Sequence, residues 1–222
     1  MDWAGFIVAF IAFFVTHSVP VRPPVRPYLV QKLGAAGFGA AYSLLSLGVL
    51  TWLIVAARNA PFVPLWDWSS WQVHLALTLM LIACLLAAMA IARPNPFSFG
   101  GARNDTFDPQ KPGVIRLTRH PLLLALAVWS VAHVLTNGDL AHVILFGTFA
   151  AFSLLGGRLV DRRRKREIGA KWHRLWRDVQ TQPLRRAIAF GELWRLVAGI
   201  ALYLLLLLGH GPVIGISPLQ SL

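Results

Sequence analysis

The residues of this chain best suited to chemistry are its histidines. The 222-residue sequence has only nine acidic residues, almost none in its apolar segments, so a carboxylate proton relay has nothing to be built from. It has no glycine-rich phosphate loop, no paired-cysteine metal motif and no Gly-x-Ser-x-Gly elbow. Neutral imidazole, by contrast, is a common metal ligand. There are seven histidines to place: His17, His74, His120, His133, His142, His173 and His210.

His17 ends an aromatic stripe. Phe6, Phe10 and Phe13 precede it at spacings of 4, 3 and 4, so all four side chains share one face of a helix. This pattern is typical of an axial ligand beside a flat apolar cofactor. The alternative is a histidine at the membrane interface above ordinary aromatic packing.

His120 stands directly before Pro121, and proline suits the first position of a helix because its missing N–H costs nothing there. The charge pattern described below places this helix start, like His17, on the cytoplasmic side of a membrane. Two imidazoles on different helices at similar depth could ligate an iron porphyrin from both faces. His17 and His120 are therefore the predicted haem ligands.

Arginines near these histidines could bind the haem propionates, because guanidinium binds carboxylate through two hydrogen bonds. The candidates are Arg119, with Arg22 and Arg116. Phe10, Phe13 and Phe14 are the candidates for packing against the porphyrin. The alternatives are topology signals and lipid phosphate contacts for the arginines, and plain interhelical packing for the phenylalanines.

The remaining histidines give a weaker signal. Four fall on the opposite membrane side and could converge on zinc or copper, although no pair has close ligand spacing. Histidines are also at ease at an interface, which is the alternative. His173 is expected to be solvated, and Cys84, the single cysteine, to pack in a helix. The four histidines on the opposite membrane side are His74, His133, His142 and His210.

The composition predicts that the elements positioning these residues are membrane helices. Hydrophobic residues make up 56% of the chain and charged residues 14%, and the mean hydropathy is +0.60. These values exclude a disordered chain and an ordinary soluble domain. The acidic start at Asp2 argues against a removable signal peptide. We expect one domain over 1–222, an all-α bundle with six spans at about 3–21, 36–57, 72–92, 121–136, 141–159 and 193–209.

The net charge of +12 is explained better by the orientation of the chain in a membrane than by a nucleic-acid partner. Of the 21 basic residues, 19 fall in alternate loops, which is the positive-inside pattern with both termini on the non-cytoplasmic side. A role in nucleic-acid binding is correspondingly disfavoured. The run at 162–166 (RRRKR) is expected to lie beside anionic membrane lipid.

Two connections carry further expectations. Residues 93–119 form a 27-residue loop rich in proline and glycine, and a loop of this length is usually functional or mobile. The residues at 137–139 (NGD) predict a tight turn, so the fourth and fifth spans should form a closely packed antiparallel pair.

The sequence resembles the NnrU family of bacterial membrane proteins over nearly all of its length. The residues that carry this resemblance are 13–18 (FFVTHS), 113–121 (GVIRLTRHP) and a basic helix around 161–176. That family is associated with denitrification and nitric oxide metabolism. It is related to zeta-carotene isomerase, a haem b membrane enzyme with two histidine ligands, and the resemblance implies that these ligands are His17 and His120 here. The isomerase has a cysteine just before its second histidine where this chain has Leu117, which favours haem binding over carotenoid isomerisation.

A second resemblance is to membrane methyltransferases of the isoprenylcysteine carboxyl methyltransferase type. Those enzymes bind S-adenosylmethionine at the cytoplasmic surface through an Arg-His-Pro motif and a later acidic and aromatic segment. Here the motif is at 119–121, and Asp161 with tryptophans Trp172 and Trp176 replaces the usual Glu and Tyr pattern. This reading leaves His17 unexplained.

Three functions therefore remain, and haem b binding in a bacterial inner membrane is favoured. If the chain is an enzyme, the NnrU resemblance implies a haem-dependent isomerase or oxidoreductase. The second function is methyl transfer from S-adenosylmethionine. The third is a non-catalytic factor that assembles a nitric oxide reductase. The implied partners are membrane lipid and membrane proteins of denitrification or respiration.

Overall fold

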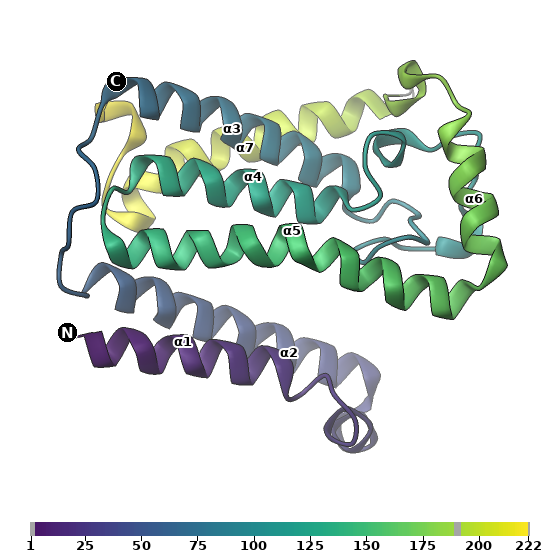
Figure 1. Cartoon of the computed structure of the whole chain (residues 1–222), viewed down its shortest axis with the longest axis horizontal. Helices are drawn as coiled ribbons and strands as arrows, with labels where there is room; N and C mark the ends of the chain where they lie inside the picture. The colour runs from purple at the N-terminus through teal and green to yellow at the C-terminus, as the bar shows by residue number, and fades with distance from the viewer. Residues whose placement is uncertain (1–2, 189–191, 222) are drawn as a thin grey trace. The chain divides into compact units, whose positions relative to one another are not determined.

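The computed structural model describes residues 3–188 and 192–221, and these are helices joined by loops and short 3-10 turns (Figure 1). The described residues form no strand, only an isolated bridge between Pro64 and Asp139. The predicted all-α class is confirmed. The α-helices are α1 Trp3–Ser18, α2 Val25–Arg58, α3 Ser70–Ala90, α4 Pro121–Thr136, α5 Leu140–Ile168, α6 Ala170–Gln180 and α7 Leu193–Ile214.

Four of the described helices are long and apolar enough to cross a membrane: α2, α3, α5 and α7. Helices α1 and α4 are apolar but have 16 residues each, which corresponds to about 24 Å at the helical rise. A bilayer core is about 30 Å thick. Each of the six predicted segments forms a helix over most of its length. That all six cross the membrane completely, and on which side of it the two termini lie, stay predictions.

The chain divides into two compact units. The N-terminal unit consists of the residues up to Trp66 together with Gly138–Leu145. The main unit consists of Asp67–Asn137 together with the residues from Phe146 on. Each unit is described by itself below. The prediction of one domain over 1–222 stays a prediction.

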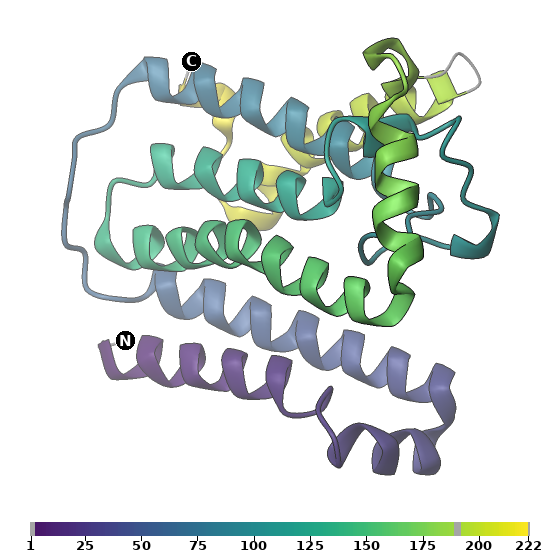
Figure 2. The ribbon, with the colours of Figure 1, turned by 45° about the vertical axis from the view of Figure 1, so that its right-hand side comes forward.

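In the N-terminal unit, α1 packs along α2. Helix α2 bends near its start, as Figure 2 shows, because Gly34 has φ 72° and ψ 165°, far from helical values. The predicted span at 36–57 is the straight part after this bend. The chain before α5 is held by Leu65, whose N–H donates to Gly138 O at 2.7 Å.

In the main unit, α3 packs against both α4 and α7 (Figure 1). Helices α4 and α5 are antiparallel neighbours. The start of α4 meets the later part of α5, because His120 Nε2, directly before α4, lies 3.1 Å from Asp161 Oδ1 of α5. Near the other end, the Trp129 ring lies 5.2 Å from the ring of Phe146. The predicted antiparallel pairing of these two segments is confirmed.

Two stretches of the 93–119 loop, 95–98 and 112–115, are buried, whereas the residues between them are exposed or half-buried. Its short 3-10 helices are η1 Asn104–Thr106 and η2 Gly113–Arg116. Phe97 and Ile115 from this loop are fully buried against Trp172 and Val179 of α6. Helix α6 runs across the ends of α3 and α4 with this loop beside it (Figure 1 and Figure 2). The apolar face of α6 thus covers these two loop residues.

Candidate functional site

The ring of His17 is fixed by its own helix. Its Nδ1 donates to the carbonyl oxygen of Phe13 at 2.8 Å, and its ring stacks on the Phe13 ring at 4.0 Å. Because a carbonyl can only accept, Nδ1 carries the proton and Nε2 carries the lone pair. No described residue forms a hydrogen bond to Nε2. Metal-bound histidines commonly have this arrangement, with one nitrogen on a backbone carbonyl and the other on the metal.

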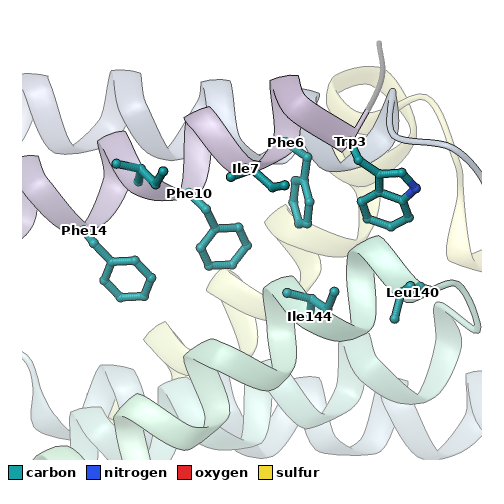
Figure 3. Close-up of a pocket in the computed structure, with 8 residues that line it drawn as sticks. Trp3, Phe6, Ile7, Phe10, Phe14, Leu140 and Ile144 are labelled. Carbon is teal, nitrogen blue, oxygen red and sulfur yellow. The ribbon is translucent and has the colours of Figure 1, made fainter.

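An apolar groove lies on the N-terminal unit along α1 (Figure 3). Its volume is about 460 Å³, and aromatic rings of α1 project toward Leu140 and Ile144 of α5. Phe10 and Phe14 line this groove, whereas Phe13 lies under His17. The groove is lined by Trp3, Phe6, Ile7, Phe10, Ile11, Phe14, Leu140 and Ile144.

Arg22 lies in the turn between α1 and α2 and is exposed. Its backbone N–H donates to Val19 O, and its carbonyl accepts from Arg26 N–H. The turn therefore fixes the backbone of Arg22 at the end of α1 that carries His17.

In the main unit, His120 is held between two side chains. Its Nε2 lies 3.1 Å from Asp161 Oδ1 and its Nδ1 lies 3.0 Å from Ser98 Oγ. The Asp161 carboxylate only accepts, so Nε2 carries the proton and Nδ1 accepts from the Ser98 hydroxyl. Ser98 is 1% exposed. A nucleophile must reach its substrate, so this Ser-His-Asp chain does not have the arrangement of a serine hydrolase.

Arg119 joins the same carboxylate and stacks on two indole rings. Its Nε and Nη2 lie 3.1 and 2.8 Å from the two oxygens of Asp161. Its guanidinium carbon lies 4.7 Å from the centre of the Trp176 ring and 5.5 Å from that of Trp172. Asn95 Nδ2 donates to the Arg119 carbonyl at 3.0 Å. The guanidinium group is thus fixed by an ion pair and by cation–π contacts.

The environment of His120 favours its neutral form. Burial lowers the pKa of the imidazole below its ordinary value, and the positive charge of Arg119 also lowers it. The Asp161 carboxylate acts in the opposite direction but does not compensate for burial. A neutral imidazole keeps a lone pair, which ligation requires.

Arg116 is engaged elsewhere in the main unit. Its Nε donates to Gln182 O at 2.6 Å, and its Nη1 donates to Gln180 Oε1 at 3.3 Å. These contacts join η2 to the end of α6. As a propionate ligand Arg116 would have to give up contacts that it already makes, and so would Arg119.

The predicted site residues fall in two groups. His17, Phe10, Phe13, Phe14 and Arg22 belong to the N-terminal unit, and Arg116, Arg119 and His120 to the main unit. The prediction that the two imidazoles face one another is not tested by either group alone and stays a prediction.

The sequence predicted neither Asp161 nor Ser98 as a partner of His120, although Asp161 belongs to the methyltransferase resemblance. Asp161 is the only acidic residue between Arg158 and Arg166. An acidic residue alone among basic ones is the sequence signal that could have identified Asp161 as the counter-ion of Arg119 and the partner of His120. No sequence signal identifies Ser98, which lies in an irregular loop.

The four histidines assigned to the opposite side belong to different units, His142 to the N-terminal unit and the other three to the main unit. Among the described residues, no group of three or more His, Cys, Asp or Glu side chains could hold a metal ion. His142 Nδ1 instead pairs with Asp139 Oδ2 at 2.7 Å. The His133 ring lies 4.9 Å from the Trp129 ring at an interplanar angle of 46°, and His210 Nδ1 donates to Ile216 O. The described part of the chain therefore gives no support to a zinc or copper site.

Comparison with known families decides the relationship. A family model described as NnrU protein matches residues 5–218. The chain belongs to the NnrU family. No curated protein and no solved structure matches it.

Haem iron can take two imidazole ligands, and this NnrU-family protein has two candidate histidines for them. His17 fits directly because no side chain in the described part of the chain forms a hydrogen bond to its Nε2. His120 fits once its Nε2 leaves Asp161, since both of its ring nitrogens are hydrogen-bonded.

S-adenosylmethionine fits less well. A sulfonium would bind to the aromatic faces of Trp172 and Trp176, but Arg119 already lies over both.

Proposed function

We propose that this NnrU-family membrane protein binds haem b, with His17 and His120 as axial ligands. The observation that carries the proposal is the hydrogen bond from His17 Nδ1 to Phe13 O, which leaves Nε2 with its lone pair next to apolar rings. The family membership and the neutral state of His120 support it.

The roles of this chain's residues follow from their contacts. Phe13 orients the His17 imidazole by stacking under it, and Phe10 and Phe14 provide an apolar groove on α1. Without a bound cofactor, Asp161 and Ser98 both hold the His120 ring, and Arg119 holds Asp161 in place. Once Nε2 leaves Asp161 to act as a ligand, Ser98 would be the side chain that orients the ring. Bound haem would supply one-electron redox chemistry. The associated physiological setting that we propose is nitrogen oxide metabolism at a bacterial inner membrane.

The test is the absorption spectrum of the detergent-purified protein, oxidised and reduced. We expect a sharp Soret band that is shifted or lost in His17→Ala and in His120→Ala. His173→Ala is the matched control, because this exposed histidine of α6 is not a proposed ligand. Full occupancy by haem in both ligand variants would contradict the assignment. If the wild-type protein binds neither haem nor S-adenosylmethionine, an assembly role gains support instead.

A second candidate function is methyl transfer from S-adenosylmethionine. It is favoured by one observation: Arg119 and His120 of the Arg-His-Pro motif converge with Asp161 and the two α6 tryptophans. Binding of labelled S-adenosylmethionine, lost in Asp161→Asn and unchanged in His17→Ala, would favour it over haem.

We also propose that all six apolar helices enter the membrane, with both termini on the non-cytoplasmic side. The positive-inside distribution supports this arrangement. A reporter enzyme that folds only outside the cytoplasm should be active when it is fused to either terminus. A fusion at Lys171 should give none.

A further inference from the structure

A basic hollow lies on the main unit away from His120. Its volume is about 570 Å³, and the residues that line it are Gln110, Lys111, Arg185 and Arg186. Three of these four side chains are cationic and none is acidic. The hollow therefore gathers three cationic side chains, and the nearby carboxylate of Asp108 accepts from the backbone N–H of Gln110 at 2.8 Å.

The arginines of the hollow differ in how they are held. Arg186 Nη1 donates to Gln110 O at 2.8 Å and to Gln182 Oε1 at 2.5 Å, so it joins the 93–119 loop to the segment after α6. Lys111 and Arg185 are exposed, and no described side chain forms an ion pair with either. One guanidinium is thus prepositioned and two cations are free to close on a ligand. Guanidinium and ammonium groups in this combination are suited to phosphate.

The segment that supplies two arginines of the hollow precedes a candidate membrane span. Arg185 and Arg186 belong to the 3-10 helix η3 (Leu184–Ala187), which lies shortly before the candidate span α7. Leu184 is 63% exposed, and Trp194 in the first turn of α7 is 61% exposed. Exposed tryptophan at the start of a span is typical of the headgroup region. Because Arg185 and Arg186 come shortly before α7, we expect a phosphate bound by them to lie in the headgroup region.

We propose that this hollow binds the phosphate headgroup of an anionic phospholipid. The basic residues at this end of the chain follow the positive-inside pattern, so the lipid comes from the cytoplasmic leaflet, whose surface is anionic. The inference does not depend on haem, because none of the four lining residues is a proposed haem ligand or propionate contact.

The test is thermal unfolding of the full-length protein in detergent with added phosphatidylglycerol or phosphatidylcholine. Phosphatidylglycerol should raise the Tm of the wild type by several degrees, because a ligand that binds only the folded state stabilises it. Phosphatidylcholine should not. The rise should be lost in the double variant Lys111→Gln, Arg185→Gln, which leaves the structural contacts of Arg186 intact.

The matched control is the double variant Lys171→Gln, Arg174→Gln, which removes two exposed cations of α6 and leaves the lining residues of the hollow unchanged. It should keep the full rise in Tm. Equal loss in both double variants would overturn the proposal in favour of diffuse attraction. If inorganic phosphate raised the Tm equally, the proposal that a lipid supplies the bound phosphate would be overturned. If the first double variant does not fold, the single variants Lys111→Gln and Arg185→Gln replace it, and each should show a reduced rise; an undiminished rise in both would also overturn the proposal.

Discussion

Arg119 and Asp161 form a two-point ion pair, with Nε on Oδ1 at 3.1 Å and Nη2 on Oδ2 at 2.8 Å. The residues are 42 positions apart in the chain. The pair joins the start of α4 to α5, and the same carboxylate also accepts from His120. Asp161 is thus the common partner of both polar residues of the Arg-His-Pro motif.

Asp161→Asn should lower the free energy of unfolding by about 1–3 kcal/mol, because hydrogen bonds to charged groups contribute roughly that amount. The Asp161 side chain is only 15% exposed, so water replaces the lost contacts poorly. Thermal unfolding in detergent measures the change. Glu167→Gln is the control, since its ion pairs with Arg163 and Arg164 are exposed and it should change the Tm little. Equal effects of the two substitutions would contradict the role of Asp161.

Two adjacent glycines of α5 should respond differently to alanine. A Cβ at Gly157 would lie 3.1 Å from His120 Cδ2, which is too close for an undisturbed ring. A Cβ at Gly156 would lie 3.7 Å from the Leu123 methyl groups, an ordinary contact. Gly156→Ala should be neutral or stabilising by up to about 1 kcal/mol from helix propensity. Gly157→Ala should be less stable than Gly156→Ala by roughly 1–2 kcal/mol. Chemical denaturation measures both, and a more stable Gly157→Ala protein would show that the ring of His120 moves freely.

The stability of the haem-free protein should fall in acid partly through His120. Its pKa in the folded protein is below the ordinary value of 6.5, so the unfolded chain binds more protons as the pH falls through 6.5. The contribution is therefore complete above about pH 6.5 and is lost progressively toward the folded pKa. His120→Gln should show a shallower loss of Tm over this range. A variant with the wild-type slope would disprove this contribution.

Gly34→Ala should destabilise the protein through the backbone alone. A Cβ at Gly34 would meet nothing within 4 Å, but φ of 72° with ψ of 165° is a conformation that essentially only glycine adopts. The expected loss is about 1–3 kcal/mol. Gly39→Ala, also in open space but within the helical part of α2, should be neutral or stabilising. If both variants unfold at the wild-type temperature, the bend in α2 is not required for stability.

Hydropathy predicted the positions of the apolar helices but not where the helices end. The fifth segment was expected to end at 159, where arginines begin to replace apolar residues, whereas α5 continues to Ile168. A helix backbone needs only intrahelical hydrogen bonds and propensity, and arginine and lysine are good helix formers. The membrane boundary and the helix end are therefore separate properties, and only the first follows from hydropathy.

The local contacts of the site could be predicted better than the distant ones. Phe13 and His17 were expected to share a helix face, and their rings stack. The hydrogen bond from Ser98 to His120 could not be predicted, because the loop at 93–119 has no periodicity that fixes its path. Asp161 was noted for its position but not as the partner of His120, since a contact across 41 residues depends on how the helices pack.

The packing of the 93–119 loop has a consequence for the order in which the protein matures. Ser98 O accepts from Arg164, Ser98 Oγ meets His120, and Phe97 is covered by Trp172. Residues 164 and 172 leave the ribosome long after this loop. A nascent chain that has inserted only α3 and α4 would thus carry an open polar loop, and the fold at that end is completed only when α6 is synthesised.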